Sequence, residues 1–261
     1  MKRLLIGLGV VVAVYLLLAY VILPAAWTHY ERQPGLARRP MVTMTAGGMP
    51  GDPLNVGLIG SREDVVRVMH AAGWYPADPV TLRSSIDIIG SVVFDRAYKS
   101  APVSPLFYDG RHEDLAYEKP VGDSARHRHH VRLWEVLQSG EEGRPVWLGS
   151  ATYDAHVGVS EYTGQVTHDI SPDVDRERDF FAGSLSEAGM VNAIYEVSGV
   201  GPTLNGRNGE GSRYFTDGEI HMLDLVKDGQ KRSAPPQVLP PPPFIEAKDQ
   251  AWHGVKNMLG F

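Results

Sequence analysis

The chain has 261 residues, no cysteine and a formal net charge of −6 at pH 7. Without cysteine it can hold neither a disulfide framework nor a thiolate zinc site, and its acidic balance argues against a general nucleic-acid binder, because backbone binding needs a basic surface. Beyond an apolar N-terminal segment about 230 residues remain, enough for one large or two small domains with a sizeable core.

The N-terminal segment from Leu4 to Leu23 is uncharged and consists mainly of Leu, Val, Ile and Ala. Its length matches the roughly 20 residues that a helix needs to cross a hydrocarbon core about 30 Å thick. The run exceeds the apolar part of a cleaved signal peptide, which is about 7–15 residues, and Pro24-Ala25-Ala26 is a poor cleavage site. We therefore expect residues 1–30 to form one uncleaved transmembrane anchor.

The charges on the two sides of this segment nearly balance, since two basic residues precede it and three arginines follow it. Lys2 and Arg3 adjoin the segment directly, whereas Glu31 dilutes the later arginines. The positive-inside rule thus favours, by a small margin, a domain outside the cytoplasm.

Both flanks of the central region are rich in Pro or Gly. Residues 31–53 show no sustained periodicity and predict a juxtamembrane linker. In the tail, residues 231–261, the run Pro240 to Pro243 predicts an extended spacer, with a Pro-rich ligand for a partner protein as the alternative. After it, Trp252, Val255 and Met258 recur at helical spacing, which indicates a short helix that docks on the domain or on the membrane surface.

The domain, residues 54–230, begins with a predicted strand from Leu54 to Ile59. Ser61-x-x-Asp64 then resembles a capping box, and the apolar residues that follow it share one helical face. A second helix is indicated by a stripe that consists of Leu82, Ile86, Ile89 and Val93.

The rest of the domain is mainly strands. Short runs rich in Val, Trp and Tyr predict strands at 106–118, 131–137, 146–153, 166–170, 191–197 and 214–226. A helix is predicted from Asp173 to Glu187, and Asp217-Gly218 is typical of a turn. Segregated helices and consecutive strands favour an α+β fold: a largely antiparallel sheet with helices packed on it, preceded by one transmembrane helix.

The segment from His127 to Trp134 is unusually rich in Arg and His. In a strand, Arg128, His130 and Arg132 would share one face, opposite His129. Arginine forks match phosphate or carboxylate oxygens, so this face suits an anionic ligand. The alternative is the solvated face of an ordinary half-buried strand.

Two further side chains stand among apolar neighbours. His168 shares a face with Val166 and Ile170, which predicts a position on the core side of its strand. Arg178 interrupts an apolar helical stripe, where a buried cation needs a partner such as Asp154, Asp169 or a bound anion. The stripe consists of Val174, Arg178, Phe181 and Leu185.

Other motifs indicate less. Histidines and aspartates are dense between residues 129 and 175, but none falls into a recognised metal-ligand spacing, and no cofactor is indicated. The segment Gly206 to Gly211 lacks the Lys-Ser/Thr of a phosphate-binding P-loop and predicts a flexible loop.

An ordered series of motifs resembles the LssY C-terminal domain family of bacterial proteins, over roughly residues 56–226. The series includes Ser104-Pro105-Leu106, Asp109-Gly110-Arg111, Arg128 to Trp134, Val146-Trp147-Leu148-Gly149, Thr152-Tyr153-Asp154, Thr167-His168-Asp169-Ile170, Asp173 to Arg178 and Tyr214 to Glu219. The resemblance implies no settled activity and no catalytic residues. Such domains often follow membrane modules of the DedA or phosphatidic-acid-phosphatase type, which handle lipids, whereas here a single helix precedes the domain.

These observations lead to one functional hypothesis and two alternatives. We expect a membrane-anchored domain that binds an anionic envelope or lipid ligand through Arg111, Arg128, His130, Arg132, Asp154, His168 and Arg178. The first alternative is a hydrolase in which His168 or His130 acts with Asp154, with or without a metal ion. The second is a structural component of an envelope or secretion complex, with a protein as partner.

Overall fold

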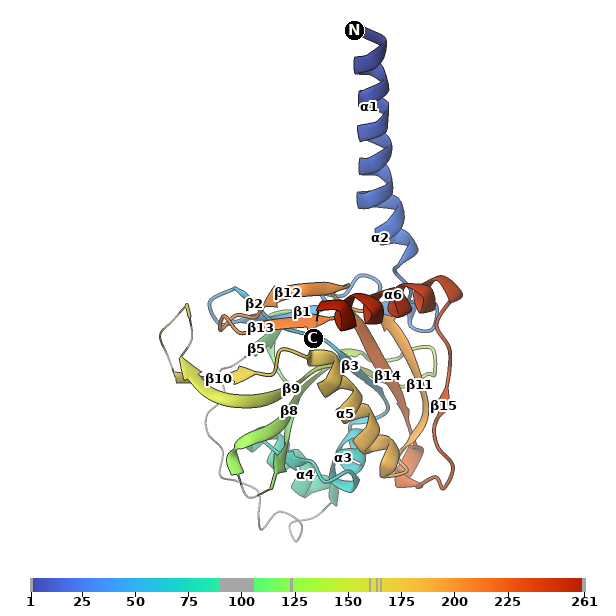
Figure 1. Cartoon of the computed structure of the whole chain (residues 1–261). Helices are drawn as coiled ribbons and strands as arrows, with labels where there is room; N and C mark the ends of the chain where they lie inside the picture. Colours follow the sequence, from blue (N-terminus) through green and yellow to red (C-terminus); the bar gives the residue numbers. More distant parts are fainter. Residues whose placement is uncertain are drawn as a thin grey trace.

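The computed structural model describes residues 2–89, 106–122, 124–159, 161–162, 164 and 166–259. It has the predicted α+β fold, with helices packed on a largely antiparallel sheet and one long apolar helix at the N-terminus (Figure 1). That helix runs through α1 (Lys2–Leu17), a π-helical turn (Leu18–Ile22) and α2 (Leu23–Ala26). Its 25 residues are long and apolar enough to cross a membrane, and none of the most apolar stretch is buried against the domain.

The connection between this helix and the domain is short. Trp27 and Thr28 alone separate Ala26, the last helical residue, from His29, which is buried. The backbone N–H of His29 donates to Ser198 Oγ at 2.9 Å. Two extended residues span about 7 Å, so the domain begins almost at the end of the helix.

Residues 31–53, expected as a linker, are instead folded into the domain. They form a 3-10 turn (Pro34–Leu36) and two short strands, β1 (Val42–Thr45) and β2 (Pro50–Pro53). Leu36 and Thr43 are fully buried. The expectation failed because strands of four residues show no periodicity, and β1 is held by pairing with β5, which lies some sixty residues later in the chain.

The main sheet has nine strands in the order β15-β11-β14-β3-β9-β8-β7-β4, with β10 added beside β9. The pairs β14–β3 and β11–β15 are parallel and the others antiparallel. The bounds are β3 (Val56–Ile59), β4 (Tyr75–Pro76), β7 (Leu115–Val121), β8 (Ser124–Leu137), β9 (Val146–Val159), β10 (Val166–Ile170), β11 (Val191–Ser198), β14 (Glu219–Leu225) and β15 (Gln237–Val238).

Three helices lie on one side of this sheet: α3 (Arg62–Ala71), α4 (Pro79–Ile89) and α5 (Val174–Glu187). Ser61 closes the predicted capping box at the start of α3. Met69 of α3 and Phe181 of α5 pack with Trp147 of β9 in the larger hydrophobic core. Val93, expected on the second helix, falls outside the described residues.

The opposite side of the sheet is covered by residues 30–54 and by a small sheet in the order β2-β1-β5-β6, which includes β5 (Leu106–Tyr108) and β6 (Arg111–His112). Leu36 and Tyr108 pack there against Trp134 of β8. The two sides of β8 therefore face two different environments.

The tail also belongs to the domain. β15 extends the main sheet, and α6 (Pro243–Leu259) lies across the side from which the N-terminal helix emerges (Figure 1). Pro243, expected in an extended run, is the first residue of α6, where its missing N–H does no harm. Lys248 of α6 forms a buried ion pair with Glu219, whose other oxygen lies 3.6 Å from His29 Nε2. Glu219 thus links α6 to the connection with the N-terminal helix.

Residues 206–211, expected as a flexible loop, complete β12 (Thr203–Arg207) and begin the turn that leads to β13 (Arg213–Thr216). The side chain of Asn208 organises this turn, because its oxygen accepts the backbone N–H groups of Glu210 and Ser212. Its amide donates to Asp52 at 2.8 Å, which fastens the hairpin to β2.

Candidate functional site

Strand β8 presents two adjacent histidines to opposite sides of the sheet. The β8–β9 register places Arg128 opposite Asp154 and His130 opposite Thr152. Arg128 and His130 contact Asp154 on the side of the small sheet, whereas His129 contacts α5 on the helical side. The predicted alternation along this strand is thus present.

The face with Arg128 and His130 is a buried network of opposite charges. Arg128 lies 3.0 Å from Glu118, and His130 Nδ1 lies 3.1 Å from Asp154. Arg128, His130 and Asp154 are each at most 5% exposed. The predicted cations therefore share a face, but carboxylates already surround them.

This network favours the charged forms of its members. Burial lowers the pKa of His130, but the hydrogen bonds to Asp154 and Glu118 outweigh burial, so the pKa is raised overall. Burial raises the pKa of Glu118, yet His130 and Arg128 hold it below its usual value. Arg128 Nη2 is nevertheless buried without a hydrogen bond to any part of the chain that the structure describes.

Of the other predicted residues, Arg132 lies close enough to this network for its charge to oppose the rise in the pKa of His130. Arg111 is exposed on β6, 3.3 Å from Asp114, and Arg132 lies 3.9 Å from the buried carboxylate of Asp52. Burial raises the pKa of Asp52. His168 lies on β10 opposite Val157, and its side chain falls outside the description.

Arg178 is buried on α5, as its stripe predicts, but its partner differs from those expected. Its guanidinium donates to both oxygens of Asp217, at 2.6 and 2.9 Å, and to the Glu219 carbonyl at 3.1 Å. Asp217 comes from the predicted Asp217-Gly218 turn, so neither Asp154 nor Asp169 is the partner. Burial, and next Asp217, raise the pKa of Asp175 beside this pair to about 6. Arg178 thus fastens α5 to the start of β14.

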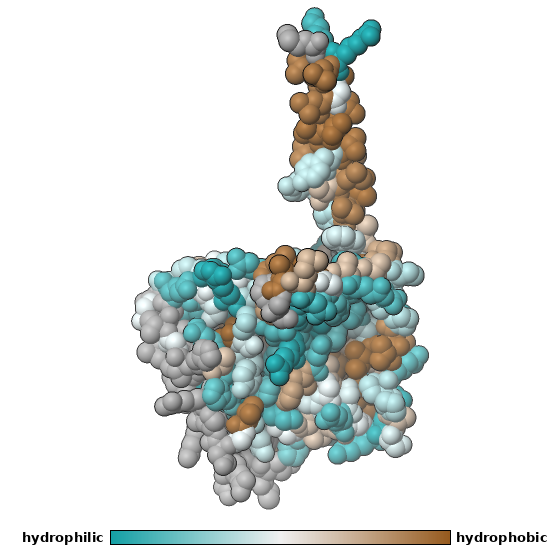
Figure 2. All heavy atoms as spheres, viewed as in Figure 1, coloured by the Kyte–Doolittle hydropathy of each residue, from teal (hydrophilic) through white to brown (hydrophobic). Residues whose placement is uncertain are grey.

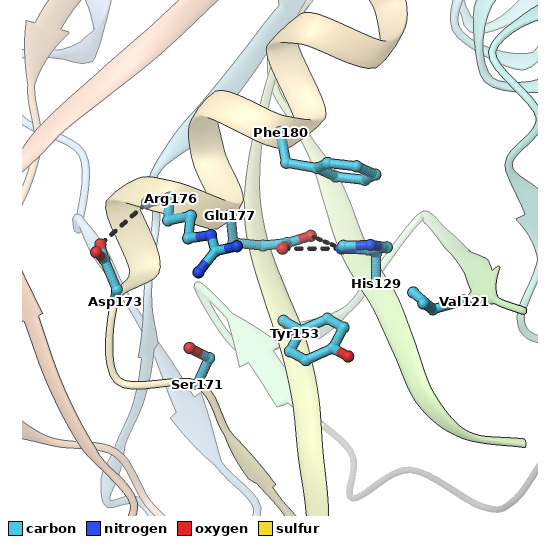
Figure 3. Close-up of a pocket in the computed structure, with 8 residues that line it drawn as sticks. All are labelled: Val121, His129, Tyr153, Ser171, Asp173, Arg176, Glu177 and Phe180. Atoms are coloured by element: carbon cyan, nitrogen blue, oxygen red, sulfur yellow. Dashed lines mark hydrogen bonds and ion pairs between the residues drawn. The ribbon is translucent and has the colours of Figure 1, made fainter. Parts of the chain in front are cut away.

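A pocket of about 380 Å³ opens on the helical side, between β8, β9 and the first turns of α5 (Figure 3). Its lining combines charged, polar and aromatic side chains: Val121, His129, Tyr153, Ser171, Asp173, Arg176, Glu177 and Phe180. We refer to it as the β8–α5 pocket.

His129 is held rigidly in this pocket. Its Nδ1 lies 2.9 Å from both oxygens of Glu177, and its ring stacks on Phe180 with 3.7 Å between centroids. Burial raises the pKa of Glu177, although the hydrogen bond to His129 opposes this effect. Nε2 of His129 makes no hydrogen bond within the described ranges, and the ring points away from Glu177 towards Val121 (Figure 3). A histidine oriented by a carboxylate can donate, accept or transfer a proton at its second nitrogen.

Arg176 supplies a cation to the same pocket. Its guanidinium points into the space above Ser171 and Tyr153 (Figure 3). Among the described residues the guanidinium of Arg176 has no ion-pair partner. Asp173 in the same pocket accepts the backbone N–H of Arg176 and pairs instead with Lys256 of α6 at 2.7 Å. Arg176 is therefore available to an incoming anion.

His129, Glu177 and Arg176 are not among the site residues that the sequence predicts. The available signal was the strand alternation, which put His129 with Val131 and Leu133 on the face opposite the Arg-rich one. Within the described part of the chain, no group of three or more His, Asp or Glu side chains is arranged to hold a metal ion.

Comparison with known proteins identifies a family. The sequence model of the family described as LssY C-terminus matches residues 33–220. No curated protein and no solved structure matches the chain. The matched range includes the β8–α5 pocket and begins inside the segment expected as a linker, and it ends before α6.

Proposed function

The chain belongs to the LssY C-terminus family, and we propose that it is a single-pass, membrane-anchored protein whose domain binds an anionic group in the β8–α5 pocket. This group is a phosphate or carboxylate of a lipid or envelope ligand. The observation that carries the proposal is Arg176, a guanidinium directed into a pocket without a carboxylate partner among the described residues. Guanidinium groups bind such oxygens through paired, charge-assisted hydrogen bonds. His129 adds a donor at Nε2 when that nitrogen carries the proton.

The position of the pocket near the N-terminal helix favours a membrane lipid as the source of the anionic group. Only two residues separate the end of the helix that we assign to the membrane from the buried His29. Asp173 on the pocket wall is joined by its ion pair to α6, on the side of the domain nearest that helix. The pocket wall is thus in direct contact with the helix that lies on that side. The flanking charges favour a domain outside the cytoplasm.

Replacing Arg176 by glutamine is expected to weaken binding of a phosphate-bearing probe by about 10- to 100-fold, the effect of losing hydrogen bonds to a charged group. The full chain in phosphatidylcholine nanodiscs would be titrated calorimetrically with dihexanoyl phosphatidic acid, inorganic phosphate and acetate. Dihexanoyl phosphatidylcholine serves as the zwitterionic probe.

Arg83→Gln, an exposed arginine on α4, is the matched control and should bind as the native chain does. Binding of phosphatidic acid alone would identify a lipid headgroup, and binding of all three anions a general anion site. If no anion binds, or Arg176→Gln binds them as the native chain does, the proposal fails.

A hydrolase is the second candidate, because His129 and Glu177 form the histidine–carboxylate pair that general-base catalysis uses. In this role Nε2 of His129 would take a proton from water, and Glu177 would position the ring. The buried pair of His130 and Asp154, one of the two His–Asp combinations predicted from the sequence, is enclosed on the opposite side of the sheet.

For the hydrolase we expect turnover of p-nitrophenyl phosphate or p-nitrophenyl butyrate by the purified chain, with a 10²- to 10⁴-fold loss in His129→Gln, roughly the contribution of a general base. His70→Gln, a histidine on α3 outside the pocket, is the control. Rates before and after EDTA treatment test for a metal. A rate equal in His129→Gln and the native chain would exclude the pocket as the catalytic site.

A further inference from the structure

Helix α6 carries an apolar stripe that the described part of the domain leaves exposed. Exposed fractions along it are 50% for Phe244, 38% for Val255, 83% for Met258 and 54% for Leu259. Ala247 and Ala251, also exposed, fall between them on the same face, since successive residues turn by about 100°. The stripe therefore runs along the whole helix.

The remaining faces of α6 have other roles. Ile245, Lys248 and Trp252 point inward and are buried. A polar face lies on the far side of the stripe and consists of Glu246, Gln250, His253 and Asn257, all exposed. A helix that only closed a soluble domain would need one apolar face, whereas α6 has a second, adjacent to the first.

The position of this helix identifies what covers the stripe. α6 lies across the side of the domain from which the N-terminal helix emerges, and Figure 2 shows apolar residues along that side. Glu219 contacts both Lys248 of α6 and His29, the first buried residue after the connection to the N-terminal helix. Because that connection spans about 7 Å, a bilayer crossed by the N-terminal helix reaches the domain surface beside α6.

We propose that the exposed stripe of α6 lies in the headgroup–acyl boundary of the same bilayer that the N-terminal helix crosses. Helices with one apolar and one polar face bind in the plane of this boundary, with the apolar face buried about 5–10 Å. The domain then contacts the membrane at two places, through the N-terminal helix and through α6. Such a contact fixes the rotation of the domain about the N-terminal helix, and with it the height and direction of the β8–α5 pocket. This proposed membrane contact of α6 does not depend on what the β8–α5 pocket binds.

The absence of native cysteine allows a direct test, since one introduced cysteine gives one labelled site. Ala251→Cys, Val255→Cys and Met258→Cys place an environment-sensitive fluorophore on the stripe, and His253→Cys and Asn257→Cys place it on the polar face of the same helix. Each full-length variant is reconstituted in phosphatidylcholine vesicles with and without brominated phosphatidylcholine. We expect a blue shift and loss of emission on bromination for the three stripe positions only.

Three results would overturn the proposal. In the first, the stripe labels emit as they do in water and are not quenched by brominated lipid. In the second, labels on both faces are quenched equally, as in a helix that has left the domain. In the third, protection of the stripe grows with the density of protein in the vesicle, which would assign the stripe to a second copy of the chain.

Discussion

Replacing Arg178 by methionine is expected to lower the free energy of unfolding by about 3–5 kcal/mol, the usual effect of removing one partner of a buried ion pair. The side chain is 6% exposed and donates to both oxygens of Asp217, whose side chain is 7% exposed. Without the guanidinium, Asp217 and Asp175 would lie in the interior without a cation. Chemical denaturation of the full chain in detergent, followed by tryptophan fluorescence, measures the change.

Arg176→Met, two residues earlier on α5 and exposed, is the matched control and should change stability by less than about 0.5 kcal/mol. The pH dependence gives a second criterion. The pKa of Asp175 is about 6, above its ordinary value, so its contribution to stability is present at low pH and is lost as pH rises through about 6. The positive charge of Arg178 opposes the rise in the pKa of Asp175. Arg178→Met should therefore destabilise the protein more at pH 8 than at pH 5. An effect equal to that of Arg176→Met would contradict the structural role of the pair.

Replacing Lys248 by methionine is expected to loosen α6 by about 3 kcal/mol, because it leaves Glu219 buried without its cation. Burial raises the pKa of Glu219 to about 7, although the charge of Lys248 lowers this pKa. Amide hydrogen exchange across residues 243–259 should then accelerate by about 100-fold, the equivalent of that free energy.

Lys256→Met is the matched control on the same helix. Its partner Asp173 is partly exposed, and such pairs contribute about 1 kcal/mol or less. Unchanged exchange across α6 in Lys248→Met would show that the apolar contacts of Ile245 and Trp252 hold the helix without the ion pair.

The elements that the sequence predicted best are those whose signals are local. Ser61 caps α3, and the stripe from Val174 to Leu185 follows the buried side of α5. β1 and β2 escaped prediction because each has only four residues, β2 contains Gly and Pro, and β1 pairs with β5 far along the chain. Arg178 shows both cases: the stripe indicated a buried cation, but its partner Asp217 lies 39 residues away and is fixed only by the folded β14.

In the candidate site, too, the sequence predicted local features but not those that depend on long-range contacts. Alternation along β8 correctly separated His129 from Arg128 and His130. Which face holds an open pocket depends on the docking of α5, since Glu177 reaches His129 across 48 residues of sequence. The density of charge pointed to the Arg-rich face, yet this density is what a buried network needs to compensate its own carboxylates.

The two residues between Ala26 and His29 limit where this domain can act. A domain on a long flexible linker samples a large volume and can meet molecules in solution or on an opposing surface. With the N-terminal helix in a membrane, as we propose, the domain cannot move far from the bilayer. Ligands that diffuse within that bilayer then reach it by a two-dimensional search at high effective concentration. An affinity too weak to retain a soluble molecule would be sufficient for such a ligand.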